Sequence, residues 1–176
     1  MSKLNSLRDL FVEEMKDLYS AERQIIAALP KMAKAVQNEE LRKAFETHLE
    51  ETKVQVERIQ QICEQLGVKP TGHPCKAMEG IIAEGQELLE QKGEPNVIDA
   101  ALIGAAQRVE HYEIAAYGCA RTYARILGLK EAEQMLQQTL DEESKTDELL
   151  TKLAESHINQ DADKGEESGR ETAGSK

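Results

Sequence analysis

The sequence predicts an all-α protein built as an antiparallel four-helix bundle. Ala, Leu, Glu, Gln and Lys dominate its 176 residues, and these residues favour helices. Four prolines and few β-branched runs disfavour a sheet. Apolar residues recur three and four positions apart along four long segments, so each segment has one face to bury. Four such helices packed around one axis would bury all four faces in a single core.

The first long helix is expected over about residues 3–36. Pro30 removes one backbone hydrogen bond, which predicts either a kink or a break near that residue. Asn38 suits the N-cap of a second helix that runs to about Leu66 and stops at Gly67. The short connection between the two helices predicts an antiparallel pair.

A long crossover should join the second and third long helices. Residues 68–75 are rich in Pro and Gly and predict a loop, and a shorter amphipathic helix follows over about 76–91. The whole link, 68–95, is long enough to carry the chain from one end of a bundle to the other. The remaining long helices are expected over about 97–127 and 130–157.

The bundle is expected to occupy residues 1–158 as one domain. Residues 159–176 are polar, contain Gly and Ser, and have almost no apolar side chains. Such a composition cannot bury enough apolar surface to fold, so we expect a disordered tail.

Net charge and cysteine content restrict the partners and the compartment. The formal net charge of −11 and the lack of a basic patch disfavour nucleic acid and anionic membrane surfaces as partners. No stretch is apolar enough to span a bilayer, and the N-terminus lacks a signal-peptide pattern. Three cysteines without paired spacing predict free thiols in a reducing compartment. These features favour a cytoplasmic protein.

Acidic residues interrupt the apolar faces of three of the four long helices. Glu22 lies near the centre of the apolar face of the first helix, and Glu113 near that of the third, with Glu110 to one side. Glu143 is central in the fourth helix, and Asp147 follows one turn later. All lie near mid-helix, so antiparallel packing would bring them to one level. A core carboxylate is unfavourable unless something neutralises it.

The second helix offers a less regular pattern. Glu50 points away from the apolar face, whereas Glu51 lies at its edge, near His48 and Gln55. We expect His48 and Glu51 to contribute from this helix, although the choice between Glu50 and Glu51 stays open.

Several carboxylates with one imidazole suit a pair of hard or borderline cations, namely iron or manganese, with zinc as a further option. Bridging carboxylates would hold two ions close together. A metal-free alternative is a salt-bridge network in which arginines neutralise the acids. Tyr117, one turn beyond Glu113, is placed to donate a hydrogen bond to a ligand carboxylate. The candidate ligands are Glu22, His48, Glu51, Glu110, Glu113, Glu143 and Asp147, and the candidate arginines are Arg23, Arg108 and Arg121.

The sequence resembles the YciF-like proteins, a ferritin-like family more distantly related to rubrerythrins and bacterioferritins. The resemblance covers about residues 4–157, and its most specific part is Val-Glu-His-Tyr-Glu-Ile-Ala at 109–115. The resembling segments are residues 17–24, 48–52, 77–80, 105–118 and 139–147.

The resemblance implies a homodimer of four-helix bundles with a dinuclear metal site and a role in bacterial stress responses. It maps ferritin-like glutamates onto Glu22, Glu110 and Glu113. The Glu-x-x-His motif that such sites use on two helices is absent. The residues found where its histidine would stand are Lys53 after Glu50, Val54 after Glu51 and Thr146 after Glu143.

Three functions follow as hypotheses. The first is peroxide or oxygen chemistry at an iron or manganese centre. The second is a non-catalytic dimer whose metal site stores ions or is vestigial, and which acts as a structural or interaction protein under stress. A purely structural bundle with salt-bridged acids is a third, so whether the protein is an enzyme stays open.

Overall fold

The computed structural model describes residues 4–164, and every regular element within them is a helix, which confirms the predicted all-α class. The second long helix, α2, begins and ends at the predicted boundaries because its Asn38 cap and its Gly67 stop form as expected. The elements are α1 (Leu7–Ala35), α2 (Glu39–Leu66), α3 (Lys76–Glu90), α4 (Pro95–Ile126), α5 (Lys130–Leu153) and a π-helical turn (Ala154–Ile158).

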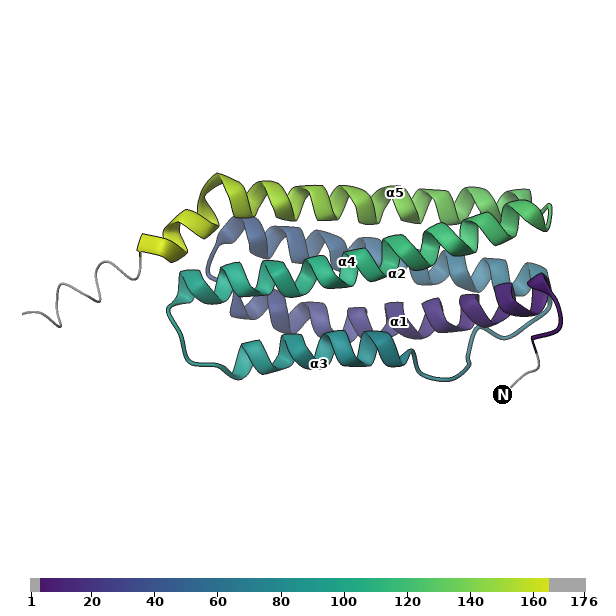
Figure 1. Cartoon of the computed structure of the whole chain (residues 1–176), viewed down its shortest axis with the longest axis horizontal. Coiled ribbons are helices and arrows are strands. Elements are labelled where there is room, and N and C mark those ends of the chain that lie inside the picture. Colours follow the sequence, from purple (N-terminus) through teal and green to yellow (C-terminus); the bar gives the residue numbers. More distant parts are fainter. Residues whose placement is uncertain (1–3, 165–176) are drawn as a thin grey trace, which may run out of the picture.

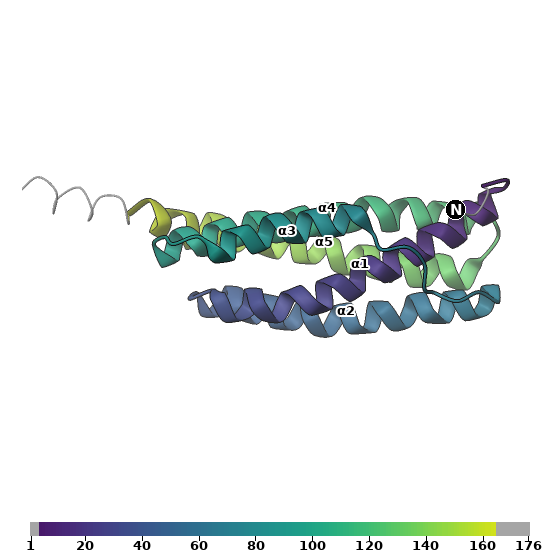
Figure 2. The same cartoon turned by 90° about the horizontal axis from the view of Figure 1, so that it is seen from below.

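Four helices, α1, α2, α4 and α5, lie side by side as a bundle, and α3 packs on the outside against α1 and α4 (Figure 1). Around the bundle α1 packs on α2, α2 on α5, α5 on α4 and α4 on α1. The end of α2 and the start of α4 lie at opposite ends of the bundle, so the link with α3 crosses its length. Seen from below, α3 runs over α4 and beside α1 (Figure 2).

Local signals fix the helix ends. The Asn38 side chain accepts a hydrogen bond of 3.0 Å from the Leu41 amide, which caps α2. Gly67 adopts φ 71°, a left-handed conformation that closes α2 without strain. The exposed Pro30 lies inside α1, which continues to Ala35, so a break at this proline is wrong. One missing backbone bond does not end a helix whose other face is packed along the bundle.

The C-terminal segment differs from the prediction. Instead of one α-helix to His157, α5 ends at Leu153, a π-turn follows, and residues 159–164 continue as α-helix. A disordered tail starting at Asn159 is therefore wrong for 159–164, and residues 165–176 lie outside the described residues. The extension is held because Ile158 is only 3% exposed and packs into the core.

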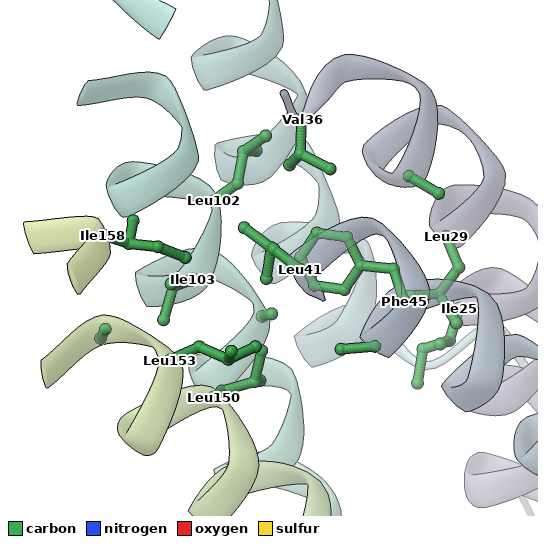
Figure 3. Packing of buried hydrophobic residues seen from close by; sticks show 14 of the residues in the cluster. Ile25, Leu29, Val36, Leu41, Phe45, Leu102, Ile103, Leu150, Leu153 and Ile158 are labelled. Atoms are coloured by element: carbon green, nitrogen blue, oxygen red, sulfur yellow. The ribbon is translucent and has the colours of Figure 1, made fainter. Parts of the chain in front are cut away.

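Two apolar clusters occupy the two halves of the bundle. The first apolar cluster surrounds Ile25, Leu41, Phe45, Leu102 and Leu150 at the end where α1 meets α2 (Figure 3). The second apolar cluster fills the other half and includes Phe11, Met15, Ile59, Tyr117 and Leu136. Between the clusters each long helix carries buried polar residues, so the core is apolar at both ends and polar in the middle.

Candidate metal centre

Glu22, His48, Glu110, Glu113 and Glu143 form the polar layer between the apolar clusters. Its members come from all four long helices, and each is at most 3% exposed. The helical repeat explains the position of Glu22, because Leu18, about one turn before it on α1, belongs to the second cluster and Ile25, about one turn after it, belongs to the first. Mid-helix acids in antiparallel helices thus meet at one level, as predicted.

Four members of the polar layer converge closely enough to bind one ion. His48, Glu110, Glu113 and Glu143 each offer a ligand atom, and these four atoms all lie within 4.8 Å of one another. The Nε2 atom of His48 is 3.4 Å from Oε1 of Glu110 and 3.8 Å from Oε2 of Glu143. One nitrogen and several carboxylate oxygens converging on one point can chelate a divalent cation.

Glu22 extends the polar layer beyond this four-residue group. Its carboxylate accepts a hydrogen bond from the Tyr117 hydroxyl, which confirms that Tyr117 donates to a carboxylate of the layer. Glu113 is within hydrogen-bonding reach of Glu22 when one of the two is protonated. The two carboxyl groups are therefore adjacent, and Glu113 also belongs to the four-residue group.

Several polar atoms of the layer have no hydrogen-bond partner although they are shielded from solvent. Leaving such an atom unpaired costs about 1–3 kcal/mol. A cation at the centre would satisfy the carboxylate oxygens and one ring nitrogen of His48 together, so these residues fit a bound metal. The unpartnered atoms are Oε2 of Glu22, Glu110 and Glu143, both carboxylate oxygens of Glu113, both ring nitrogens of His48 and Oε1 of Gln55.

Burial sets the protonation of the layer. Desolvation, reinforced by the neighbouring carboxylates, raises the pKa of Glu22, Glu110 and Glu113 well above the ordinary value. The pKa of Glu143 rises to about 7, chiefly by desolvation, while desolvation lowers that of His48 to about 4. In the absence of a cation the layer therefore holds protons on its carboxyl groups and a neutral imidazole.

The arginine alternative is wrong within residues 4–164. Arg23 and Arg108 are exposed, and Arg121 donates to the amide oxygen of Gln137 at 2.6 Å. His48 is the one basic side chain of the described residues that lies within 4.0 Å of the buried carboxylates. With a neutral imidazole at ordinary pH, that contact supplies no charge compensation.

Glu51 and Asp147 lie outside the four-residue group. The Glu51 carboxylate is half-exposed and 4.0 Å from Nδ1 of His48, on the side away from Glu110. Asp147 accepts a hydrogen bond of 3.0 Å from Gln107 and lies 3.3 Å from Nε2 of the exposed His111. Both acids border the centre, and Asp147 already has other partners.

Glu50 points away from the polar layer, as predicted, and pairs with Lys53 at 2.6 Å near the surface.

Gln55 belongs to the site, although the sequence indicated it only as a neighbour of Glu51 at the edge of the apolar face. It is fully buried, and its amide donates to Glu143 and, at 3.1 Å, to Glu142. Glu142 in turn forms a bidentate pair with Arg58, at 2.6 and 2.7 Å, which lowers the pKa of Glu142. Its seven-residue spacing from His48, two helical turns, was the signal that could have revealed it.

Two pairs of buried residues have the three-residue spacing of a Glu-x-x-His motif, but neither pair contains a histidine. Thr52 and Gln55 are both buried on α2, and so are Glu143 and Thr146 on α5. Each pair is three residues apart, the spacing at which ferritin-like bundles carry that motif. Threonine, glutamine and threonine therefore stand at three of the four buried positions that have the spacing of this motif.

Comparison with known proteins shows similarity to one protein family over most of the chain. Residues 6–163 match the family model described as "Domain of unknown function (DUF892)". The chain is 47% identical to protein YciF of Escherichia coli over 161 residues, which span 91% of this chain and 97% of that protein. No helix of residues 4–164 is both long and apolar enough to cross a membrane.

Solved structures of other proteins have the same fold. The crystal structure of the E. coli stress protein YciF matches with a TM-score of 0.85, covering 88% of this chain and 98% of that one. YcfI from Rhodopseudomonas palustris matches at 39% identity and a TM-score of 0.82, covering 85% and 95% of the two chains. A Xanthomonas campestris protein at 22% identity and a TM-score of 0.73 shares the fold.

Proposed function

This chain belongs to the DUF892 family, and on that premise we propose that it is a bacterial stress-response protein whose bundle holds a carboxylate-rich metal centre. The stress role rests on its similarity to the stress protein YciF. The metal centre rests on one observation: four buried ligand side chains converge within 4.8 Å, and their polar atoms lack partners. A homodimer in the cytoplasm is part of the same proposal.

The ligand set favours iron or manganese, with zinc as a further option. His48, Glu110, Glu113 and Glu143 would hold the first ion. Glu22, adjacent to Glu113, extends the set to a second ion, which carboxylate bridges would keep near the first. Glu51 and Asp147 lie at the border of this set, and they would serve as additional ligands.

A redox-active ion bound here would supply the chemistry of peroxide reduction or oxygen activation. The chain's own residues would orient the ligands and exclude water from them. Tyr117 holds one oxygen of Glu22, and Gln55 holds one oxygen of Glu143. The apolar clusters on both sides keep the layer dry, which strengthens every electrostatic interaction within it.

A second function is a non-catalytic site that stores metal or is vestigial, in a dimer that acts through other contacts. It is favoured by the three replaced motif positions, because Thr52, Gln55 and Thr146 are weaker ligands than glutamate or histidine. In this case the centre would hold at most one ion and stabilise the fold without turnover.

Metal analysis of the purified protein tests the proposal. We expect wild-type protein and Glu50→Gln to bind one or two manganese or iron ions per chain, and Glu113→Gln to lose binding. Peroxide turnover by iron-loaded protein, compared with a Glu22→Ala, Glu110→Ala double variant, then separates the functions. Equal turnover by wild type and the double variant would exclude catalysis at the centre and favour the storage role. Equal metal content in wild type and Glu113→Gln would refute the metal centre.

A further inference from the structure

An apolar pocket lies between α1, α3 and α4, beside the polar layer. Its walls are mainly Ile25, Leu29, Ile81, Ile82, Leu89 and Val109. The crossover helix α3 forms one side of it, since α3 packs on both α1 and α4 (Figure 2). The pocket therefore exists because the chain crosses the bundle on this face.

The pocket connects the surface with the ligands. The exposed residues Lys31 and Gln86 line it, and so do the buried residues His48 and Glu110. Its cavity volume of about 30 Å³ is room for one or two molecules the size of water. A metal ligand side chain thus faces a narrow, apolar space that leads outward past α3.

We propose that this pocket binds dioxygen and is its entry route to the His48–Glu110 side of the centre. The proposal rests on the proposed metal function for its purpose, but the pocket itself belongs to the metal-free chain. Apolar walls favour a small neutral apolar molecule, since ions and hydrogen peroxide would lose hydrogen bonds to water on entry. Apolar cavities in proteins take up xenon for the same reason, which makes xenon a suitable probe.

Gly85 controls the width of the pocket. It lies on α3 within the lining, and a Cβ at this position would sit 3.8 Å from Cβ of Ala105 across the gap. A methyl group fits there, whereas a longer side chain would extend into the pocket. Gly80 lies on the same helix with nothing within 4 Å of its Cβ position. The two glycines form a matched pair, because leucine at either gains the same helix propensity.

Two measurements on metal-free protein test the pocket. Crystals pressurised with xenon are expected to show one xenon among Ile25, Ile81 and Val109. Dissolved dioxygen is expected to enhance methyl relaxation of the buried Ile25 more than that of the equally buried Ile59 and Ile62. It should also enhance that of the partly buried Ile81 and Val109 more than that of Leu66 and Leu140, which are partly buried against the second apolar cluster. Gly85→Leu should abolish both signals, and Gly80→Leu should keep them.

Further variants keep the test decisive. Ile82→Ala widens the pocket and is expected to raise xenon occupancy, so the inference stands or falls even if Gly85→Leu folds poorly in a thermal melt. Absence of xenon from wild type, uniform methyl relaxation, or xenon retained by folded Gly85→Leu would overturn it. Manganese titration of Gly85→Leu is expected to match wild type, so loss of the pocket and loss of the metal centre are distinguishable.

Discussion

The imidazole of His48 on α2 and the carboxyl group of Glu110 on α4 meet 3.4 Å apart although their helices stand diagonally across the bundle. Each of these helices packs against α1 and α5. The contact therefore spans the bundle axis, where water is excluded. With the pKa of His48 lowered to about 4, the imidazole is neutral near pH 7 and its lone pair is free for a metal.

The metal-free protein is expected to lose stability as pH rises above 6.5. Between pH 4.5 and about 7 the folded state binds a proton at Glu143 that the unfolded state releases, so this contribution is full below pH 4.5 and is lost as pH rises from 4.5 to about 7; above that, the raised pKa values of Glu22, Glu110 and Glu113 continue the loss. His48 acts oppositely, because stability is lost as pH falls from 6.5 towards its pKa of about 4. Above pH 6.5 the imidazole is mainly neutral in both the folded and the unfolded state, so the carboxyl groups determine how the free energy of unfolding changes with pH.

Thermal melts of chelator-treated protein from pH 6.5 upward measure this effect. The shift from 4.5 to about 7 makes the whole Glu143 contribution roughly 3 kcal/mol, of which about 1 kcal/mol is still present at pH 6.5 and is lost over these melts. Glu143→Gln should show a shallower decline than wild type, since its amide does not titrate. A melting temperature that rises with pH in both proteins would contradict the expected protonation of the layer.

Metal binding should release protons. The raised pKa values of Glu22, Glu110 and Glu113 mean that these groups hold protons near pH 7, whereas metal ligation requires the ionised form. Apparent affinity should rise about tenfold per pH unit for each proton displaced. Calorimetric titration with manganese in two buffers of different ionisation enthalpy counts the protons. Equal heats in the two buffers would show that the ligands are already ionised.

Tyr117→Phe should weaken both fold and site. It removes the hydroxyl that donates to Glu22 and leaves a buried carboxylate oxygen unpaired, at an expected loss of about 1–3 kcal/mol. Binding of the ion next to Glu22 should weaken about tenfold or more. Urea unfolding and metal titration measure the two effects. Tyr123→Phe on the same helix is the control. An equal effect in that variant would contradict a specific role for the Tyr117 hydroxyl.

Asp99 ties the connection between α1 and α2 to the start of α4. It is 2% exposed, and its two carboxylate oxygens accept hydrogen bonds from the backbone amides of Gln37 at 3.0 Å and Asn38 at 2.7 Å. Asp99→Ala leaves both amides without these partners and should cost about 2–3 kcal/mol in urea unfolding. Asp99→Asn keeps one acceptor and should lose less. Equal losses in the two variants would argue against the paired bonds.

Much of the fold was predictable because it depends on local patterns. Helix spacing, the Asn38 cap and the Gly67 stop are properties of short segments, and they place the helices within a few residues. The π-helical turn after Leu153 and the helix over 159–164 were not predictable in this way. They depend on Leu153, Ala154 and Ile158 packing into the first apolar cluster.

The candidate site was predicted in part for a related reason. Glu22, Glu113 and Glu143 lie at the centres of apolar faces, so their burial follows from one helix at a time. Glu51 and Asp147 lie at the edges of such faces, where a small rotation decides between core and surface. Gln55 was predicted only as a neighbour of Glu51 and not as part of the site, because an amide in an apolar face gives no sign of the partner it will meet on another helix.

The sequence by itself determined the helices, the faces that they bury and the presence of acids on those faces. Only the tertiary structure decided that His48 meets Glu110 across the axis, that Gln55 binds Glu143 and that α3 encloses a pocket beside them. The physical reason is that helical periodicity fixes the direction of a side chain around its own axis. It does not fix the offset between helices or the side-chain rotamers, and those determine which atoms come together.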